Sequence, residues 1–406
     1  SKTKDWDFAR LFTLVSQTAQ EKDFDTNLSS EIDIRASSGG FWNASGDMRI
    51  TKLAIERGTE SMSAPNPITI ALSEGELSTE NFYLQGENNY LEMNLEQASP
   101  RALSGSIDGV MDLSLIALLT PFLEDLRGKL TVSMNLQGRL FEPRLIGSGY
   151  IEQGLLKLQE FPHPFSEINA DLLFSQKSIF INTLQASLAQ GALTGGGKVD
   201  LTDLGQIGVD VNANFRDVEL EVPEGIQTQG HGQISITGQG FPYTLSGRYQ
   251  IEDGLMSMSF SKQKNDQQNV QPSTYLPPSI SKDSTSPIFL DLDLQILKTL
   301  QVKNSLINTN VEGSMQVEGP PTQPLLTGTI TSRPGGQVFF RENVFDIRNA
   351  NIEYDNSAPE NPKLYLLAVA QVTEIIVRDR REFTNDYEVT LLIQGQAKDP
   401  QILLES

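Results

Sequence analysis

The chain has 406 residues, no cysteine, and a formal net charge of -21 from 52 acidic and 31 basic side chains. Nucleic-acid binding needs clustered lysine and arginine, so this charge argues against a DNA or RNA partner. Without cysteine the chain has no disulfide, no thiol chemistry, no iron–sulfur cluster and none of the common zinc sites.

The N-terminus begins Ser1-Lys2-Thr3-Lys4 and has no signal-peptide pattern, and no run of about 18 apolar residues occurs anywhere in the sequence. We therefore expect a fragment, or the mature form, of a longer protein.

Two segments have apolar residues at helical spacing. The first is 5–20, with Ala9, Phe12, Val15 and Ala19 on one stripe. The second is 112–126, where Pro121 should kink or split the helix. At most one or two short amphipathic helices are therefore expected.

Alternation of apolar and polar residues dominates the rest of the chain. Strands with one apolar and one polar face are typical of antiparallel sheets. The pattern is found at 31–35, 130–136, 179–181, 209–213, 233–236, 290–296 and 389–393. The sequence thus predicts an all-β fold in which helices cannot cover the apolar side of the strands.

We expect four regions along the chain. Residues 1–110 form an N-terminal part of the sheet, and residues 111–260 form central repeats that include the helix at 112–126. Residues 261–287 are polar and rich in Gln, Ser and Pro, which predicts a disordered loop insertion. Residues 288–406 form C-terminal repeats.

A motif recurs at steps of 76 to 100 residues. In each copy an apolar residue and a glycine are followed by a proline and then by a second apolar stretch. The copies start at Gly138, Gly238, Gly319 and Gly395. We interpret each copy as a strand, a proline-bearing turn and a second strand. A further glycine in the second strand allows a bulge or a close backbone approach.

Other glycines are interpreted as punctuation between strands. These include Gly46, Gly86, Gly105, Gly128, Gly195–Gly197 and Gly335–Gly336, and Gly154 and Gly254 are expected to turn the chain after the repeat strands.

Three blocks resemble the TamB family, the inner-membrane subunit of the translocation and assembly module, within the wider AsmA-like group of bridge-type lipid transfer proteins. They are 113–158 (LSLIALLTPFLEDLRGKLTVSMNLQGRLFEPRLIGSGYIEQGLLKL), 165–200, and 335–354 (GGQVFFRENVFDIRNANIEY). The likeness covers about residues 100–406. The family's N-terminal membrane anchor and its acidic-then-aliphatic tail have no counterpart in this sequence.

The resemblance implies an elongated, twisted antiparallel β-groove, or β-taco, built of repeated multi-strand units. It implies a place in the periplasm of a diderm bacterium, with anchoring in the inner membrane in the full-length protein. Its implied partners are phospholipid and an outer-membrane barrel protein of the TamA/BamA type, and no cofactor is implied.

An apolar sheet face must be hidden from water. We expect the alternating apolar residues to line a trough for lipid; an ordinary sandwich core would show the same alternation and stays the alternative. The predicted lining consists of Leu130, Val132, Met134, Leu136, Val209, Val211, Leu290, Leu292, Leu294, Ile296, Val389, Leu391 and Ile393.

No catalytic motif stands out. His163 and His231 are interpreted as loop residues, and Asp291 and Asp293 as members of a solvated acidic face. We therefore expect no enzyme and no metal site. The expected function is conduction of phospholipid between the inner and outer membranes, and the alternative is a chaperone-like scaffold for assembly of outer-membrane β-barrel proteins or autotransporters. A secreted adhesin, a polysaccharide-binding protein and a transmembrane barrel fit the few aromatic residues less well.

Overall fold

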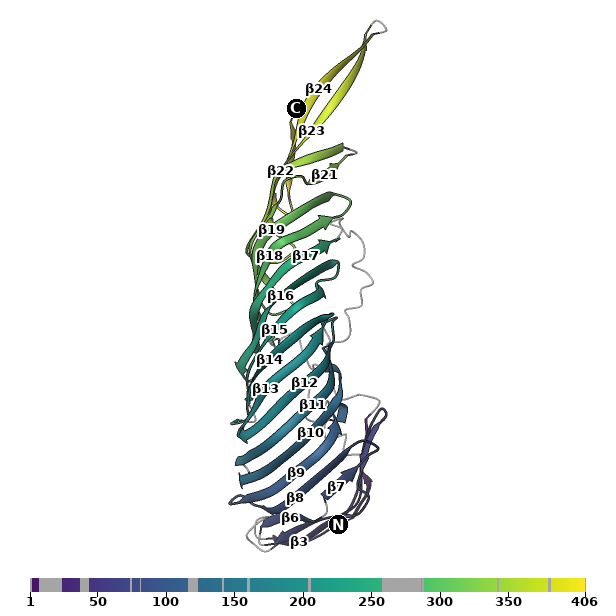
Figure 1. The fold of residues 1–406 in the computed structure, drawn as a ribbon, viewed down its shortest axis with the longest axis vertical. Coiled ribbons are helices and arrows are strands. Elements are labelled where there is room, and N and C mark those ends of the chain that lie inside the picture. The colour runs from purple at the N-terminus through teal and green to yellow at the C-terminus, as the bar shows by residue number, and fades with distance from the viewer. Residues whose placement is uncertain are drawn as a thin grey trace. The chain divides into compact units, whose positions relative to one another are not determined.

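The protein is described here from a computed structural model. The structure describes residues 2–6, 24–36, 44–73, 75–80, 82–115, 123–140, 142–158, 161–203, 206–257, 286, 288–341, 343–378 and 381–405. Most of these residues lie in 25 β-strands, and the only regular helix in this described part is a three-residue 3-10 turn, η2 (Leu113–Leu115). The strands form twisted and mostly antiparallel sheet (Figure 1). The all-β prediction is confirmed.

The chain divides into two compact units, which we describe separately. The described residues of unit 1 lie in 1–188 and 193–211, and those of unit 2 lie in 189–192, 212–270 and 285–406.

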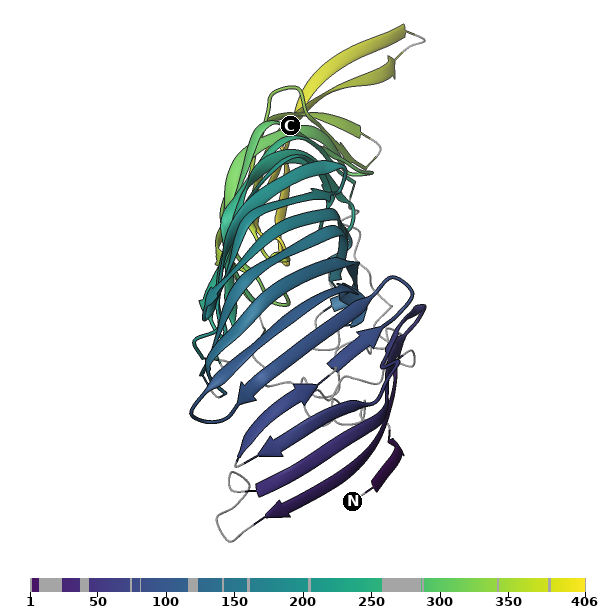
Figure 2. The ribbon, with the colours of Figure 1, turned by 60° about the horizontal axis from the view of Figure 1, so that its bottom comes forward.

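Unit 1 contains the strands up to β14. They are β1 (Lys2–Trp6), β2 (Phe24–Ala36), β3 (Ala44–Arg57), β4 (Glu60–Ser63), β5 (Ile68–Ser73), β6 (Glu76–Glu80), β7 (Phe82–Gln85), β8 (Tyr90–Ala98), β9 (Leu103–Asp112), β10 (Leu123–Arg139), β11 (Glu142–Leu158), β12 (Phe165–Gln176), β13 (Ser178–Leu188) and most of β14 (Gly191–Asp200). From β8 to β13 each strand pairs antiparallel with the next. The long strand β3 pairs at one end with β4 and at the other with β5. Figure 2 shows these strands following one another around a strongly curved sheet.

Unit 2 contains the remaining strands. They are most of β15 (Gly208–Glu221), β16 (Ile226–Gln239), β17 (Tyr243–Met256), β18 (Ile288–Lys303), β19 (Ile307–Gly319), β20 (Leu325–Ser332), β21 (Gln337–Phe340), β22 (Asn343–Ser357), β23 (Lys363–Arg378), β24 (Arg381–Gln396) and β25 (Gln401–Glu405). The strands β17 and β18 pair in parallel, with Tyr243 opposite Ile288 and Met256 opposite Val302. The predicted disordered insertion 261–287 falls in the connection between these two strands and, apart from Ser286, lies outside the described residues.

The helix predicted at 112–126 is wrong at both of its ends. Asp112 ends β9, and Leu123 begins β10, where it pairs with Leu158. The Asp112 carboxylate accepts hydrogen bonds from the backbone N–H groups of Ser114 (2.8 Å) and Gly128 (3.3 Å). A short polar side chain that caps nearby backbone donors favours a turn over a continued helix. Residues 116–122 lie outside the described residues.

The helix predicted at 5–20 is also wrong at its start, because Asp5 and Trp6 belong to β1. This strand pairs with β2, and the Asp5 backbone N–H donates a hydrogen bond to Ser29 Oγ. Residues 7–23 lie outside the described residues.

The four repeat copies are antiparallel hairpins, as predicted. Their strand pairs are β10–β11, β16–β17, β19–β20 and β24–β25. The first glycine of each copy has a positive φ, between 94° and 151°, at or next to the end of the first strand. Glycine adopts this backbone region with little cost, which explains its place before each turn.

Several glycines interpreted as punctuation lie inside strands instead. Gly105, Gly128 and Gly195–Gly197 belong to β9, β10 and β14, and Gly46 belongs to β3. Gly154 and Gly254 do not turn the chain either, because β11 and β17 continue through them with shifts of register. The physical reason is close backbone approach: a Cβ at Gly46 would lie 2.0 Å from the Asp33 carbonyl oxygen.

Candidate functional site

The apolar face of β10 in unit 1 is formed by Leu130, Val132, Met134 and Leu136. In the ladders on its two sides, Met134 lies opposite Ile107 and Gly147, and Val132 lies opposite Gly109 and Gly149. On this face, large side chains on one strand therefore lie opposite glycines on a neighbouring strand. The space above such a glycine is filled by a side chain from a nearby strand. A Cβ at Gly149, for example, would lie 3.1 Å from Phe174 Cε2.

The apolar face of β18 in unit 2 has the same arrangement. Leu292 lies between Gly247 and Val317, and Ile296 lies between Ile251 and Gly313. The remaining two residues, Leu290 and Leu294, lie opposite Leu245 and Gly319 and opposite Tyr249 and Met315, respectively. The predicted lining residues of this strand thus share one face with apolar residues of both neighbouring strands.

Tyr249 brings a polar group to this face. Its hydroxyl lies 3.0 Å from Thr228 Oγ1 and 3.5 Å from the Val218 carbonyl oxygen, to which it donates. Burial raises the pKa of Tyr249, while the Thr228 hydrogen bond acts in the opposite direction. The hydroxyl is therefore neutral at physiological pH and its hydrogen bonding is satisfied within the protein.

The remaining predicted residues lie on β15 and β24. Val209 and Val211 are half-buried, and a Cβ at Gly197 would lie 2.6 Å from Val211 Cα. Leu391 is fully buried, with Val389 and Ile393 packed around it.

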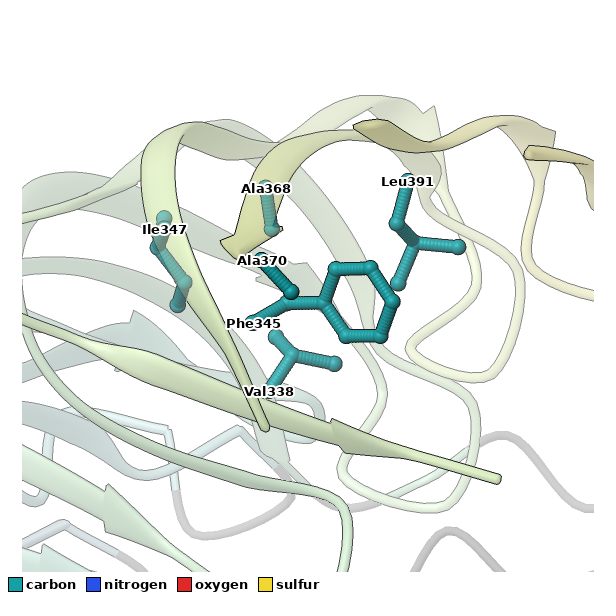
Figure 3. Packing of buried hydrophobic residues seen from close by; sticks show 6 residues of the cluster. All are labelled: Val338, Phe345, Ile347, Ala368, Ala370 and Leu391. Carbon is teal, nitrogen blue, oxygen red and sulfur yellow. The ribbon is translucent and has the colours of Figure 1, made fainter. Parts of the chain in front are cut away.

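Figure 3 shows Leu391 in a closed cluster at the C-terminal end of unit 2, facing the ring of Phe345. The cluster also contains Val338, Ile347, Ala368 and Ala370, from β21, β22 and β23. Here the apolar face of the sheet is covered by the protein's own side chains.

The degree of burial differs among the predicted residues. Among the thirteen predicted residues only Val132 and Leu391 are buried, at 6% and 0% exposure, and the other eleven are half-buried. A side chain in a packed sandwich core is normally fully enclosed. The predicted residues on β10, β15 and β18 are thus mostly half-buried, while other apolar residues of these strands, such as Phe215 on β15 and Leu300 on β18, are buried.

The opposite face of the same strands is mainly polar, although Phe289 and Leu297 of β18 are also exposed there. Ser133 donates a hydrogen bond to Asp108 (2.5 Å), and Gln316 donates one to Asp291 (3.3 Å). Asp293 lies 3.9 Å from the Arg248 guanidinium, and both side chains are more than half exposed. Asp291 and Asp293 therefore have the surroundings of a solvated surface.

The two histidines occupy different structures. His163 lies between β11 and β12, whereas His231 lies within β16, so the loop interpretation of His231 is wrong. The alternation of β16 continues through it, and its Nδ1 lies 3.5 Å from Glu252 Oε1. In the described part of the chain no group of three or more histidine, aspartate or glutamate side chains could hold a metal ion.

Several residues of these faces were not predicted from sequence, among them Ile107, Phe174 and Tyr249. The signal that could have identified the β9 residues is the alternation of Gly105, Ile107, Gly109 and Met111, in which glycine occupies apolar-face positions. Phe174 and Tyr249 needed the strand register.

Together these features define a class of protein: an all-β protein of long, mostly antiparallel strands with one mainly polar face and one apolar face, which is closed by its own side chains only in part. The chain belongs to the TamB family, because residues 181–406, more than half of its length, match the TamB C-terminal domain. A search among curated proteins gave no match.

The TamB family is associated with transport of lipid and protein in the bacterial envelope, and it works with TamA-like partners in general. Within the residues that the structure describes, no helix has the length and hydrophobicity required to cross a membrane.

Proposed function

We propose that the protein conducts phospholipids between the inner and outer membranes of a diderm bacterium, with the acyl chains held against the apolar faces of its sheets. The observation that carries this proposal is the half-buried state of nine of the ten predicted lining residues on β10, β15 and β18. An apolar surface left partly open is the usual signature of a binding surface.

The energetics favour a continuous apolar surface over free diffusion. Moving a phospholipid with some 32 chain methylenes into water costs on the order of 25 kcal/mol, at about 0.8 kcal/mol per methylene. Half-buried leucine, valine and methionine side chains offset that cost without enclosing the lipid. The lipid can therefore leave as readily as it enters.

The proposed lining is the predicted set on β10, β15 and β18; Val389, Leu391 and Ile393 of β24 belong to or pack against the closed cluster and are not part of it. We place this activity in the periplasm, with a TamA/BamA-type barrel in the outer membrane as the partner at delivery. No chemical step is required of any side chain, so we propose a transport role and not an enzyme.

The test uses a charge placed on the apolar face. Leu294→Asp puts a carboxylate among Tyr249 and Met315, which lie opposite Leu294 in the two neighbouring strands. The matched control is Gln295→Asp, which puts the same carboxylate on the exposed face of the same strand. Lipid bound to the purified protein is measured by mass spectrometry, and transfer of labelled phospholipid is measured between donor and acceptor vesicles.

We expect Leu294→Asp to lose at least tenfold in both measurements, with the circular dichroism spectrum unchanged, and Gln295→Asp to behave like the parent protein. Unfolding of Leu294→Asp would instead identify β18 as part of a packed core. Normal lipid transfer by a folded Leu294→Asp variant would also refute the proposal.

One observation favours a second candidate, a chaperone-like scaffold for outer-membrane β-barrel proteins or autotransporters. The β22 ladder on β23 ends at Val369, and the β25 ladder on β24 spans only Thr390–Gln394. Beyond these points β23 and β24 pair only with each other in the described structure, as the projecting hairpin in Figure 1 shows. Unpaired strand edges bind other extended chains by β-augmentation.

A photo-crosslinking residue at Val372, in the projecting part of β23, tests this candidate against one at Tyr365, in the part flanked by two strands. Both positions are 36% exposed. An unfolded outer-membrane β-barrel protein is diluted from urea into the crosslinking reaction. If the protein assists assembly, position 372 should crosslink to it and position 365 should not. Equal yields at the two positions would count against it.

A further inference from the structure

The apolar face of β18 continues across the strands that follow it in unit 2. Ile296 lies opposite Gly313 of β19, and Gly313 lies opposite Ile330 of β20. The ladders continue from Ile330 to Ile352 of β22 and then to Leu364 of β23. Directly paired residues have their side chains on the same face of a sheet. Ile330, Ile352 and Leu364 therefore share the apolar face of β18.

One side of this face is closed by the protein's own side chains. On β18 and β19, the buried residues Leu300, Val302 and Val311 form a second cluster. Ile307 packs against this second cluster and also against the closed cluster of Figure 3, so the two clusters join. We call the residues of the two clusters together the closed side, which extends from β18 to Leu391 of β24.

Beside the closed side, half-buried apolar side chains follow one another from β18 to β23. Ile330 packs against the second cluster and so marks the border. Ile352 and Leu364 are absent from the described residues that form or contact the two clusters. On β20 this half-buried zone is narrow, because Leu326 on its other side is only 8% exposed. We call the zone the open strip, and its members are Leu292, Leu294, Met315, Ile330, Ile352 and Leu364.

The open strip suits a ligand that makes no hydrogen bonds. The strands beneath it, β18, β19, β20, β22 and β23, each pair with a neighbour on both sides at this strip. Tyr249 and Tyr354 bring hydroxyls to this face, but these donate to the carbonyl oxygens of Val218 (3.5 Å) and Pro359 (3.3 Å). A polypeptide backbone needs hydrogen-bond partners, whereas an acyl chain needs only apolar contact. The strip therefore favours an acyl chain.

We propose that phospholipid acyl chains lie on the open strip and continue past the closed cluster over Ile330, Ile352 and Leu364. This inference rests on the proposed function and extends its lining to three residues on β20, β22 and β23. The closed side confines the chains to the strip, because its side chains already fill the space above their part of the face.

Photolabelling maps the path on the full chain without any substitution. The protein is incubated with vesicles of phosphatidylglycerol and a phosphatidylcholine that carries a diazirine in one acyl chain. After irradiation, adducts are assigned to residues by peptide mass spectrometry. We expect adducts on the open strip, Ile352 and Leu364 included, and at least tenfold fewer on Val302, Val311 and Leu391.

The pattern of adducts separates this inference from the proposed function. Equal labelling of the closed side would overturn the inference, and so would adducts on Leu292 and Leu294 with none on Ile352 and Leu364. Both of these outcomes leave lipid binding by β18 in place. A parent protein without adducts anywhere on the strip would refute the proposed function together with the inference.

A charge on β23 tests the new part of the path. Leu364→Asp puts a carboxylate on the strip, and Tyr365→Asp, at a 36% exposed position on the reverse face of the same strand, is the matched control. We expect Leu364→Asp to lower the labelling of Ile352 at least tenfold and to leave that of Leu292 unchanged, with the control like the parent. Unchanged labelling of Ile352 in a variant with a native circular dichroism spectrum would contradict the path. If Leu364→Asp does not fold, the map of the parent decides.

Discussion

Gly147 lies directly opposite Met134 in the β10–β11 hairpin, and a Cβ on Gly147 would lie 2.1 Å from the carbonyl oxygen of the preceding residue, Ser133. The same relationship recurs in unit 2. Gly247 lies opposite Ile234, with a Cβ distance of 2.2 Å to Gln233, and Gly328 lies opposite Met315, with 2.3 Å to Ser314. The second glycine of the repeat is thus required by the close approach of the paired backbone.

Gly147→Ala should therefore destabilise unit 1 by about 1–3 kcal/mol, because backbone atoms must move to admit the methyl group. Gly149→Ala, two residues further along β11, is the control. A Cβ there would lie 3.1 Å from the Phe174 ring and 3.2 Å from the Thr131 carbonyl oxygen, so the neighbours need to give by only a few tenths of an ångström. The midpoints of urea denaturation compare the two variants, and equal midpoints would contradict the close-approach explanation.

The repeat and the alternation made most of the fold predictable from sequence. Period-two patterning gave the strands of 130–136 and 290–296, and the glycine–proline motif gave the four hairpins, because both signals are local. The C-terminal end of the helix predicted at 112–126 was mispredicted because Leu123 and Leu126 have helical spacing in the sequence but pair across the β10–β11 ladder. Propensity and spacing are overridden where a neighbouring strand satisfies the backbone.

The register was not predictable in the same way. The parallel pairing of β17 with β18 joins residues 45 positions apart, Tyr243 and Ile288, and no local pattern encodes that choice. For the same reason the sequence could not distinguish Leu391, in a closed cluster, from Leu292, on a half-buried face. Both residues lie in segments with apolar residues at every second position.

Leu391 and Leu294 should respond differently to truncation. Leu391 is fully buried, so Leu391→Ala should cost about 2–5 kcal/mol through loss of packing and creation of a cavity. Leu294→Ala removes a half-buried side chain from an incompletely closed face and should cost under about 1.5 kcal/mol. Chemical denaturation followed by far-ultraviolet circular dichroism measures the stability of both variants. A large loss of stability for Leu294→Ala would favour the packed-core alternative for β18.

The phenol of Tyr249 should make stability depend on pH in the alkaline range. Burial raises its pKa in the folded protein, so the unfolded chain loses this proton at lower pH than the folded chain. The stabilising contribution is therefore complete below the ordinary tyrosine value of about 10 and falls as the pH rises above it.

Tyr249→Phe should cost about 1 kcal/mol at pH 8, because the hydrogen bond to Thr228 is lost. The difference in free energy of unfolding between the variant and the parent should shrink at pH 10.5. At that pH the Tyr249 phenol destabilises the parent, whereas phenylalanine has no proton to lose. Tyr365→Phe, at an exposed ring, is the control and should stay within about 0.5 kcal/mol of the parent. A difference for Tyr249→Phe that stays constant between the two pH values would contradict the assignment.

The parallel pair sets a minimum length for the connection between β17 and β18. Because Tyr243 pairs with Ile288 and Met256 with Val302, the chain must return along the whole of β17 before β18 begins. At about 3.3 Å per residue this path is roughly 43 Å, which takes at least about 13 extended residues. The sequence provides residues 257–287 for it.

Deleting residues 262–271 should therefore leave folding and stability unchanged, whereas deleting 260–283 should break the β17–β18 pairing. The thermal midpoint and the pattern of limited proteolysis distinguish these outcomes. An antiparallel pair needs only a short turn between its strands. A stable protein after the longer deletion would thus show that β18 can pair with β17 in the opposite direction, and it would remove the one parallel step described in unit 2.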